Sequence, residues 1–285
     1  MHKELPADLR QAIAEVVTDR AHGASELARR ALEIVGVAAR EQPADDADAL
    51  RDLLYRLANA LTAAHPSMAP IYNLLACWRE EVDQIEAEDL AALRTQSAQC
   101  AEHIAQASRR AVAVIAKRGA QLVRPGQTII THSLSSTVVA ILGELTDRQI
   151  KVIVTEARPR CEGYQLAKQL SAWAIPTTLI TDAQMGFFIQ AADVALVGAD
   201  SLLPDGGVVN KAGTYLLALA AKAHDRPFYV CCESFKRRRA AMPPLELEAM
   251  DPTELGAPVY AHVIPKNIYF EVTPAQLVTD WINER

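Results

Sequence analysis

The spacing of apolar residues changes character once along this chain, near Gly119. Before that point apolar side chains recur every three or four residues, as at Leu9 and Ile13, which is the spacing of an amphipathic helix. After it, short runs rich in β-branched residues alternate with helical segments, the pattern of successive β-α-β units. The sequence therefore predicts a helical domain at residues 1–118 and an α/β domain at residues 119–285.

The first domain is expected to consist of helices only. We expect them around residues 9–17, 25–35, 47–64 and 82–118. The polar break from Asp19 to Ser25 contains a glycine and a serine of the capping type, which favours a helix start there. Lys117 and Arg118 end the last helix, where the helix dipole favours cations.

The second domain carries a series of predicted strands. They are Thr128–Thr131, Val152–Thr155, Thr177–Ile180, Val194–Val197 and Phe228–Cys231, with helical segments near 136–146, 163–173, 184–191 and 212–224 between them. This alternation predicts an α/β fold with a mostly parallel, doubly wound sheet, which binds ligands at the carboxyl ends of its strands. The proline-rich segment Arg237–His262 is expected to be an irregular surface excursion before a last strand and a closing helix over Pro274–Glu284.

The composition argues against several classes of function. A net charge of −6 leaves no general basic field, which argues against direct nucleic-acid binding. No apolar stretch is long enough to cross a bilayer, so we expect no membrane association. The five cysteines show no C-x-x-C spacing, which indicates reduced thiols in a cytoplasmic protein and no zinc site. The sequence has no G-x-G-x-x-G after a predicted strand and no G-x-x-x-x-G-K-[ST], so a dinucleotide enzyme or a P-loop nucleotidase is disfavoured.

Polar clusters follow the first two predicted strands, at the edge where a doubly wound sheet places its chemistry. The cluster Thr131–Thr137 includes His132 and Ser133 and opens a helix, so it is either an anion site at a helix N-terminus or a helix cap. In the cluster Thr155–Gly163 the arginines either grip a phosphate bidentately or belong to a solvated loop with an internal ion pair.

Further polar groups follow the later strands. Asp200 comes after the strand Val194–Val197 and either acts as a general base, holds a substrate hydroxyl or caps the next turn. Asn210 and Lys211 lie in a short hairpin that delivers an amide and an ammonium to a helix start, a clamp for an anionic or hydroxylated ligand. Lys236 heads a basic run that is typical of solvated surface. Taken together, these groups favour a small phosphate ester as the ligand.

A series of motifs in the second domain resembles one known family. The motifs are THSLSS (131–136), TEARPRCEG (155–163), VGADSLLPDGGVVNKAGT (197–214), PFYVCCESFK (227–236) and IYFEVTP (268–274). In this order they resemble the translation initiation factor 2B alpha/beta/delta family, which also contains methylthioribose-1-phosphate isomerase and ribose-1,5-bisphosphate isomerase. The resemblance implies a helical first domain, a Rossmann-like second domain, and a homodimer or higher homo-oligomer built on the C-terminal domain.

The resemblance also implies roles for individual residues. The isomerases move a proton with a cysteine and an aspartate. Asp200 matches the aspartate, whereas Ser133 occupies the cysteine position, and a serine hydroxyl is a far weaker acid than a thiol. Asn210, Lys211 and Lys236 match positions that bind the substrate.

Several other positions of the isomerase site have counterparts in this chain. They are His22, Gly23, Ala24, His65, Arg158 and Glu162. Gly23, Ala24 and Arg158 match the isomerases, whereas the two histidines stand in place of arginines and the glutamate in place of a glutamine. These three changes weaken a site for a doubly charged phosphate, because two permanent cations are lost and an anion is added.

The sequence supports three functional hypotheses. The first is a non-isomerase member of the family that binds a sugar phosphate or nucleotide at the cleft between the domains. The second is an aldose-ketose isomerase of the ribose-1,5-bisphosphate or methylthioribose-1-phosphate type, with a proton shuttle rearranged around Ser133, Asp200 and His132. The third is an assembly subunit with a vestigial pocket. No metal or other cofactor is expected.

Overall fold

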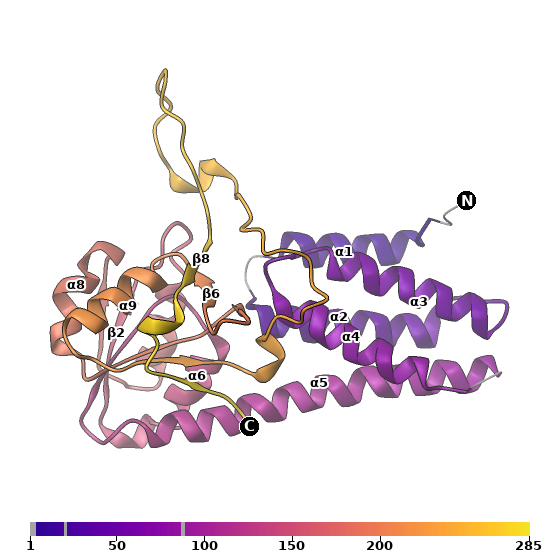
Figure 1. Cartoon of the computed structure of the whole chain (residues 1–285), viewed down its shortest axis with the longest axis horizontal. Helices are drawn as coiled ribbons and strands as arrows, with labels where there is room; N and C mark the ends of the chain where they lie inside the picture. The colour runs from indigo at the N-terminus through magenta and orange to yellow at the C-terminus, as the bar shows by residue number, and fades with distance from the viewer. Residues whose placement is uncertain (1–3, 20–21, 87–88) are drawn as a thin grey trace. The chain divides into compact units, whose positions relative to one another are not determined.

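The computed structural model describes residues 4–19, 22–86 and 89–285 of the chain (Figure 1). The chain packs as two compact units. The helical unit consists of Met1–Arg110 together with Phe235–Pro244, and the sheet unit consists of Ala111–Ser234 together with Leu245–Arg285. The division between them along the chain falls inside one long helix, and a short later segment returns to the first unit.

The helical unit is built from amphipathic helices, as the spacing of apolar residues predicts. They are α1 (Ala7–Thr18), α2 (Ala24–Glu41), α3 (Ala47–Thr62), α4 (Ala69–Asp83) and the first part of α5 (Leu90–Gln121). Their buried faces are rich in alanine and leucine, and the indole of Trp78 donates to the carbonyl of Ser97 at 3.0 Å inside this core.

Two helix starts differ from the prediction. The helix expected over Val82–Arg118 is wrong at its start, because α4 ends at Asp83 and the carboxylate of Asp89 caps a new helix by accepting the N–H of Ala92 at 3.1 Å. Residues 87 and 88 of that prediction lie outside the described residues. Helix α4 was not predicted, since Pro70 marks its first turn rather than a break.

The start of α2 also differs from the prediction in its capping residue. Gly23 occupies the N-cap position, and Ser25 is buried inside the first turn. Ser25 is therefore not the helix cap. Residues 20 and 21 of the predicted polar break lie outside the described residues.

The segment Phe235–Pro244 belongs to the helical unit and packs on it through buried polar groups. Asn73 on α4 donates to the carbonyl of Arg237 at 2.8 Å, and the guanidinium of Arg238 donates to the carbonyl of Pro66 at 3.3 Å. Lys236 and Arg238 are both buried. The interpretation of this basic run as solvated surface is therefore wrong for these two residues, because the guanidinium of Arg238 satisfies backbone carbonyls instead of water.

The sheet unit contains a six-stranded, all-parallel sheet of order β3-β2-β1-β4-β7-β9. Its strands are β1 (Thr128–Thr131), β2 (Lys151–Thr155), β3 (Thr177–Ile180), β4 (Val194–Val197), β7 (Phe228–Cys231) and β9 (Asp280–Ile282). The order reverses between β1 and β4, which makes the carboxyl ends of these two strands the topological switch point. The prediction of a mostly parallel, doubly wound sheet is confirmed.

Helices cover both faces of this sheet. They are α6 (Ser136–Gly143), α7 (Gly163–Ala172), α8 (Met185–Phe188) and α9 (Thr214–Ala223). Short 3-10 turns elsewhere in the described residues are Thr146–Arg148, Asp182–Gln184, Ile189–Ala191, Ser234–Lys236, Pro252–Leu255 and Ala275–Leu277. Ile129 packs into a cluster with α6 and α7, whereas its neighbour Ile130 packs into a separate cluster with α8 and α9. Successive strand residues point to opposite faces, so each strand is buried on both sides.

A small antiparallel sheet of order β5-β6-β8 stands beside the switch point. It is formed by β5 (Ser201–Leu202), β6 (Val208–Lys211) and β8 (Phe270–Thr273). The closing helix predicted over Pro274–Glu284 is wrong, because this stretch forms one 3-10 turn and the edge strand β9. Trp281 pairs with Val230 of β7 in that edge position, so pairing with the sheet outweighs the helical spacing of the segment.

The chain between β7 and β8 forms a projection that we call the arm, residues 249–268. It leaves the body of the sheet unit and returns to it (Figure 1). The predicted irregular surface excursion Arg237–His262 is confirmed for its later part, where residues 256–262 are all exposed, and is wrong for its first part, because residues 237–244 pack on the helical unit. Within the part of the chain that the structure describes, none of the helices combines the length and apolarity that a bilayer crossing needs.

Candidate functional site

The sheet unit and the helical unit each hold some of the predicted site residues. The sheet unit contains Ser133, Arg158, Glu162, Asp200, Asn210 and Lys211, and the helical unit contains His22, Gly23, Ala24, His65 and Lys236. Ser133, Arg158, Glu162 and Asp200 follow β1, β2 and β4, at the carboxyl edge beside the switch point. Asn210 and Lys211 are the last two residues of β6 in the small sheet.

Lys211 forms an ion pair with Glu162, and both are predicted site residues. The Lys211 Nζ lies 2.6 Å from the Glu162 Oε1, and the side chains are only 7% and 17% exposed. The same ammonium lies 4.3 Å from the centre of the Tyr269 ring. The other carboxylate oxygen, Glu162 Oε2, is buried and has no hydrogen-bond partner among the described residues. The cation at the site is therefore compensated within the chain, and one buried acceptor remains unused.

His132 joins three segments at the carboxyl edge of the sheet. Its Nδ1 lies 2.6 Å from the Thr155 Oγ1, and its Nε2 lies 2.8 Å from the carbonyl oxygen of Ala212. A carbonyl only accepts, so Nε2 carries the proton and donates to Ala212. Burial lowers the pKa of His132, so the ring is neutral and Nδ1 accepts from the Thr155 hydroxyl. Both nitrogens are therefore engaged, and neither is free to act as a base for Ser133.

The loops after β1 and β2 contain unusual backbone conformations. Ser133, Ala157 and Cys161 have positive φ values of 67°, 59° and 57°, which are uncommon for residues other than glycine. The carboxylate of Asp182 accepts the backbone N–H groups of Ala157 and Arg158 at 2.8 and 2.7 Å. Strained residues held by such contacts are frequent at functional sites, and here they border the switch point.

The N-termini of two helices at this edge are capped by the chain itself. Ser135 caps α6 by accepting the N–H of Val138, so the cap that we considered for Thr131–Thr137 is present. At α9 the Glu271 Oε1 accepts the N–H groups of Gly213 and Tyr215 at 2.7 and 2.8 Å. Sequence reasoning missed Glu271. Its signal is the acidic residue in IYFEVTP, which pairs with Asn210 in the small sheet.

Asn210 and Asp200 take up different positions beside the pair. Asn210 is buried, and its amide donates to the Thr214 hydroxyl at 3.0 Å. Thr214 in turn donates to the carbonyl of Lys211 at 2.6 Å, so the Asn210 side chain helps to fix the turn that carries the lysine. Asp200 is partly exposed, and its backbone N–H donates to Val209 at 2.8 Å where β4 passes into the small sheet.

The Arg158 side chain points to the arm. Its guanidinium donates to the carbonyl of Leu255 at 2.8 Å. Arg158 therefore has a structural role, because this hydrogen bond ties the arm to the loop after β2.

Two glycines allow strand ends and helix starts to approach closely at this edge. A Cβ on Gly163 would lie 1.8 Å from the carbonyl oxygen of Thr155, and one on Gly198 would lie 2.3 Å from the Ser135 Oγ. No side chain fits at Gly163, where the obstacle is backbone, and a side chain at Gly198 would displace the Ser135 side chain. The geometry of the loops that carry Glu162 and Ser133 therefore depends on these glycines.

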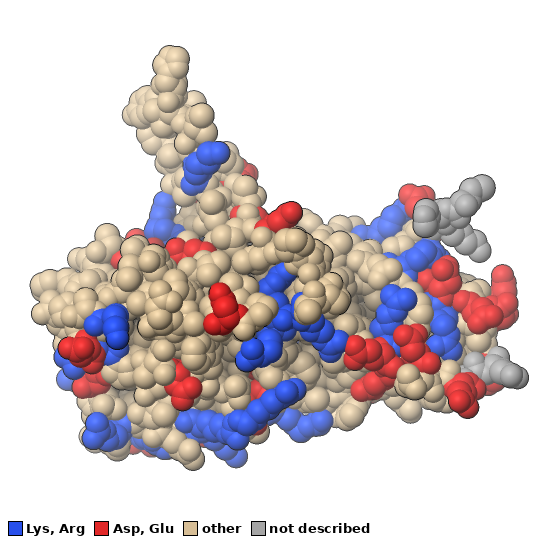
Figure 2. Space-filling view, viewed as in Figure 1, with Lys and Arg blue, Asp and Glu red and all other residues tan. Residues whose placement is uncertain are grey.

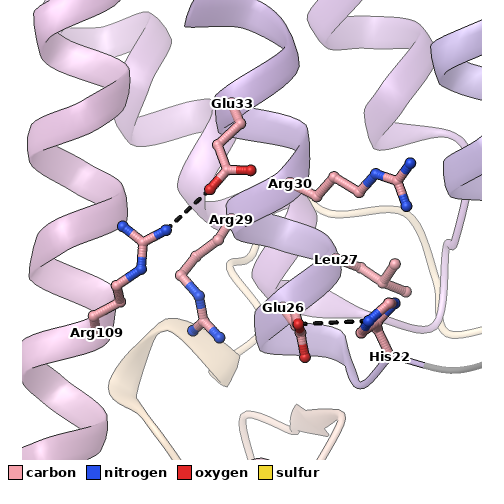
Figure 3. Close-up of a pocket in the computed structure, with 7 residues that line it drawn as sticks. All are labelled: His22, Glu26, Leu27, Arg29, Arg30, Glu33 and Arg109. Carbon is pink, nitrogen blue, oxygen red and sulfur yellow. Dashed lines mark hydrogen bonds and ion pairs between the residues drawn. The ribbon is translucent and has the colours of Figure 1, made fainter.

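In the helical unit, His22 lines a pocket of about 280 Å³ (Figure 3). We call it the arginine pocket, and its lining residues are His22, Glu26, Leu27, Arg29, Arg30, Glu33 and Arg109. The His22 Nδ1 lies 2.8 Å from the Asp19 Oδ2, and this hydrogen bond raises the pKa of His22. Glu26 approaches the other ring nitrogen to 3.6 Å.

Most of the positive charge of the arginine pocket is already paired. Arg30 forms ion pairs with Glu15 and Asp19 at 2.8 and 3.3 Å. Arg109 pairs with Glu33 at 2.9 Å (Figure 3). Sequence reasoning missed these arginines, because they lie on α2 and α5 away from any motif.

The remaining predicted residues of the helical unit are buried or lie in the backbone of α2. His65 is 3% exposed, and its Nε2 lies 2.9 Å from the carbonyl oxygen of Val16, so it contributes to the core of the unit. Gly23 is the N-cap of α2, and Ala24 is its buried first residue. Lys236 is buried as well. Among the residues that the structure describes, no three histidine, cysteine, aspartate or glutamate side chains come together as metal ligands.

The fold and the carboxyl-edge residues define a class of two-unit α/β proteins, with a helical unit and an all-parallel sheet that carries polar side chains at its switch point. The model of the Initiation factor 2 subunit family matches residues 20–285, and the chain belongs to this family.

Its relatives include both initiation-factor-like proteins and isomerases. The chain is 36% identical over 282 residues to a Pyrococcus horikoshii protein called eIF-2B subunit 2-like, covering 98% of this chain and 96% of that one. It is 31% identical over 274 residues to a ribose 1,5-bisphosphate isomerase of Pyrococcus furiosus, covering 92% and 85%. Among solved structures, the translation initiation factor eIF-2B of P. horikoshii superposes with a TM-score of 0.84 at 35% identity, covering 98% and 96%.

Proposed function

We propose that this chain is a non-isomerase member of the family, related to translation initiation factor 2B. In this proposal it binds a small phosphorylated ligand, a sugar phosphate or a nucleotide, at the carboxyl edge of its sheet. Lys211 and Asn210 contact the ligand, and Asp200 holds one of its hydroxyl groups. The protein acts in the cytoplasm as a homo-oligomer that forms through the sheet unit.

The ion pair between Lys211 and Glu162 carries this proposal. In the isomerases that the sequence resembles, a neutral glutamine stands at the position of Glu162. Here the carboxylate lies 2.6 Å from the ammonium, so a bound phosphate competes with an anion of the chain. We infer that the site favours a phosphate monoester with hydroxyl groups over a bisphosphate, because a monoester brings less negative charge next to Glu162. The unpartnered Glu162 Oε2 supports this inference, because a ligand hydroxyl would satisfy it.

The surroundings of Ser133 support the absence of isomerase activity. Proton transfer at a sugar carbon needs a group that ionises near neutral pH, and a serine reaches that reactivity only beside a base. His132 adjoins Ser133 in sequence, but its two nitrogens are bonded to Thr155 and Ala212. The shuttle that uses His132 would have to break these buried hydrogen bonds.

An aldose-ketose isomerase of the ribose-1,5-bisphosphate or methylthioribose-1-phosphate type is the second candidate. The observation that favours it is the partial exposure of Asp200 at the switch point, where a carboxylate can reach a substrate. In this case Asp200 would act as the base. A water molecule or a substrate hydroxyl, rather than Ser133, would supply the proton that the cysteine supplies in the isomerases.

Binding and turnover are measured separately to test the proposal. Binding is measured by thermal shift. Ribose 5-phosphate and adenosine monophosphate are expected to raise the melting temperature of the protein, because a ligand at a hundred times its dissociation constant adds about 2.7 kcal/mol of stability. Lys211→Met is expected to abolish the shift. Lys168→Met removes an exposed lysine on α7 and serves as the matched control.

Turnover is followed by carbon NMR with ribose 1,5-bisphosphate and methylthioribose 1-phosphate. We expect no ketose to form. Ketose formation that Asp200→Asn abolishes would overturn the proposal in favour of the isomerase. Absence of any thermal shift across the panel would instead favour an assembly subunit with a vestigial pocket.

A further inference from the structure

Tyr269 is a buried tyrosine that stands directly before β8 and beside Lys211. It is 4% exposed, and the centre of its ring lies 4.3 Å from the Lys211 Nζ. The carbonyl of Tyr269 accepts the N–H of Ala212 at 2.7 Å, and the next residue, Phe270, pairs with Lys211 in the small sheet. The backbone therefore fixes the ring next to the lysine.

The hydroxyl of Tyr269 is bonded at the base of the arm. It donates to the carboxylate of Glu254, which also accepts a side-chain N–H of Asn267 at 3.0 Å. Burial, together with the hydrogen bond to Glu254, raises the pKa of Tyr269 to about 12, although the Arg160 guanidinium acts in the opposite direction. The hydroxyl therefore keeps its proton at neutral pH and remains a donor, so the ring is held at both of its ends.

The loop after β2 connects the same two places. Arg158 donates to the carbonyl of Leu255 in the arm at 2.8 Å, and Glu162 pairs with Lys211 at the site. One loop therefore meets the arm on one side and the lysine on the other, and Tyr269 spans the same distance through its ring and hydroxyl.

The charged groups of the arm belong to its base. Figure 2 shows blue and red side chains where the projection leaves the sheet unit and only tan atoms at its far end. Residues 256–265 contain no lysine, arginine, aspartate or glutamate, and Tyr260 among them is 63% exposed. Tyr260 is therefore a tyrosine of the same projection that lies outside the site and serves for comparison.

The surroundings of the Lys211 ammonium restrict the direction in which it can meet a ligand. An ammonium has three N–H donors, and one of them points to the Glu162 Oε1 at 2.6 Å. The face of the Tyr269 ring attracts the charge without adding a second carboxylate that would compete with an anion. A side chain that is fixed before binding loses less conformational entropy when the ligand arrives.

We propose that Tyr269 is a positioning residue of the ligand site, whose ring holds the Lys211 ammonium in place for a phosphate and whose hydroxyl anchors the ring at the base of the arm. The inference rests on the proposed function, because it requires Lys211 to contact the ligand. It goes further in assigning to Tyr269 an effect on ligand affinity that acts through the lysine.

The experiment compares Tyr269→Phe with Tyr269→Met in the full chain. Both changes remove the hydroxyl and only the second also removes the aromatic ring, so the difference between the two variants reports the ring. Isothermal titration calorimetry measures the dissociation constant of ribose 5-phosphate. Tyr260→Met is the matched control. Tyr269→Leu is a second variant without a ring, and circular dichroism checks the folding of each variant.

We expect the dissociation constant of Tyr269→Phe to stay within about threefold of the wild type, and that of Tyr269→Met to rise by about tenfold or more. The control is expected to bind as the wild type does. The ε-methylene protons of Lys211 give an independent signature in NMR spectra. The ring current is expected to move their resonances upfield in the wild type and in Tyr269→Phe, and this shift should be absent from Tyr269→Met.

The outcomes separate the inference from the proposed function. Equal dissociation constants for Tyr269→Phe and Tyr269→Met would overturn the role of the ring, while ligand binding by the wild type would leave the proposed function intact. Lys211 resonances that are equal in the wild type and Tyr269→Met would also overturn the inference, because the ring would then not contact the lysine. A wild-type chain that binds no ribose 5-phosphate, with the ring-current shift present, would overturn both.

Discussion

The ammonium of Lys211 lies 2.6 Å from the carboxylate of Glu162 and is covered by the ring of Tyr269. The pair is mostly removed from water, so each charge depends on the other for compensation. A ligand phosphate that approaches Lys211 has to displace or tolerate this carboxylate. We therefore expect the carboxylate of Glu162 to limit how tightly an anion binds at Lys211.

Replacing Glu162 by glutamine is expected to strengthen phosphate binding. The change keeps the shape of the side chain and removes its charge, so Lys211 becomes available to an anion. We expect the dissociation constant of ribose 1,5-bisphosphate to fall by about tenfold, which corresponds to about 1.4 kcal/mol. Isothermal titration calorimetry measures it.

The same variant is expected to unfold at lower urea concentration without ligand, because a buried ammonium loses its partner, at a cost of about 1–3 kcal/mol. Glu144→Gln removes an exposed carboxylate of the sheet unit and is the control. Equal affinities of the two variants for the bisphosphate would show that Glu162 does not control the site.

Removing the carboxylate of Glu271 is expected to destabilise the sheet unit. Glu271→Ala leaves the N–H groups of Gly213 and Tyr215 without their acceptor at the start of α9. The expected loss is about 2 kcal/mol of unfolding free energy, in the range of a lost helix cap. Glu271→Gln keeps an acceptor oxygen, so urea titration should place it between the alanine variant and the wild type. A stability of the alanine variant equal to that of the wild type would contradict the capping role.

His22 is expected to titrate above its ordinary pKa of 6.5, because its ring bonds to Asp19 and lies near Glu26. A raised pKa in the folded state means that the stabilisation is complete below pH 6.5 and is lost as the pH rises through the folded pKa. Proton NMR of the ring measures the shift. Asp19→Asn should move the pKa back toward 6.5, and an unmoved pKa would rule out the hydrogen bond as its cause.

His132 is expected to behave in the opposite way. Burial lowers its pKa, so the folded chain keeps the ring neutral while the unfolded chain takes up a proton near pH 6.5. Its contribution to stability is therefore present above pH 6.5 and is lost as the pH falls below that value. Nitrogen-15 NMR should show the proton on Nε2. A proton on Nδ1 would mean that the bonds to Thr155 and Ala212 are arranged differently.

Two glycines of the sheet unit offer a matched pair of substitutions. A Cβ on Gly163 would overlap the carbonyl of Thr155 at 1.8 Å, so Gly163→Ala is expected to cost about 3 kcal/mol or more. A Cβ on Gly186 meets nothing within 4 Å, and alanine is the better helix former there, so Gly186→Ala is expected to be neutral or stabilising by up to about 1 kcal/mol. Urea titration of both variants tests the comparison, and equal stabilities would contradict the close packing at Gly163.

The central strands of the sheet could be predicted from the sequence because they are short, apolar and bounded by turns. The predicted bounds Thr177–Ile180 and Val194–Val197 are those of β3 and β4. Strand β9 could not be predicted in the same way. It lies at the edge, its residues are partly exposed, and it becomes a strand only by pairing with β7, which local spacing does not encode.

The sequence proposed individual residues for the candidate site but not the contacts that they make. The motifs pointed to Glu162 and Lys211 separately, 49 residues apart, and only the fold shows that they neutralise each other. His132 was considered for its chemistry, whereas its hydrogen bonds to Thr155 and Ala212 depend on segments that meet in three dimensions. The catalytic or binding roles of Asp200 and Ser133 stay predictions.

The return of Phe235–Pro244 to the helical unit has a consequence for the synthesis of the chain. Asn73 is made early, but its partner carbonyl at Arg237 leaves the ribosome only after most of the sheet unit has been translated. The helical unit therefore cannot finish packing during translation of its own first 110 residues. We expect a nascent chain stopped at residue 110 to remain sensitive to proteases and to engage chaperones, and this sensitivity to end once residue 244 has emerged.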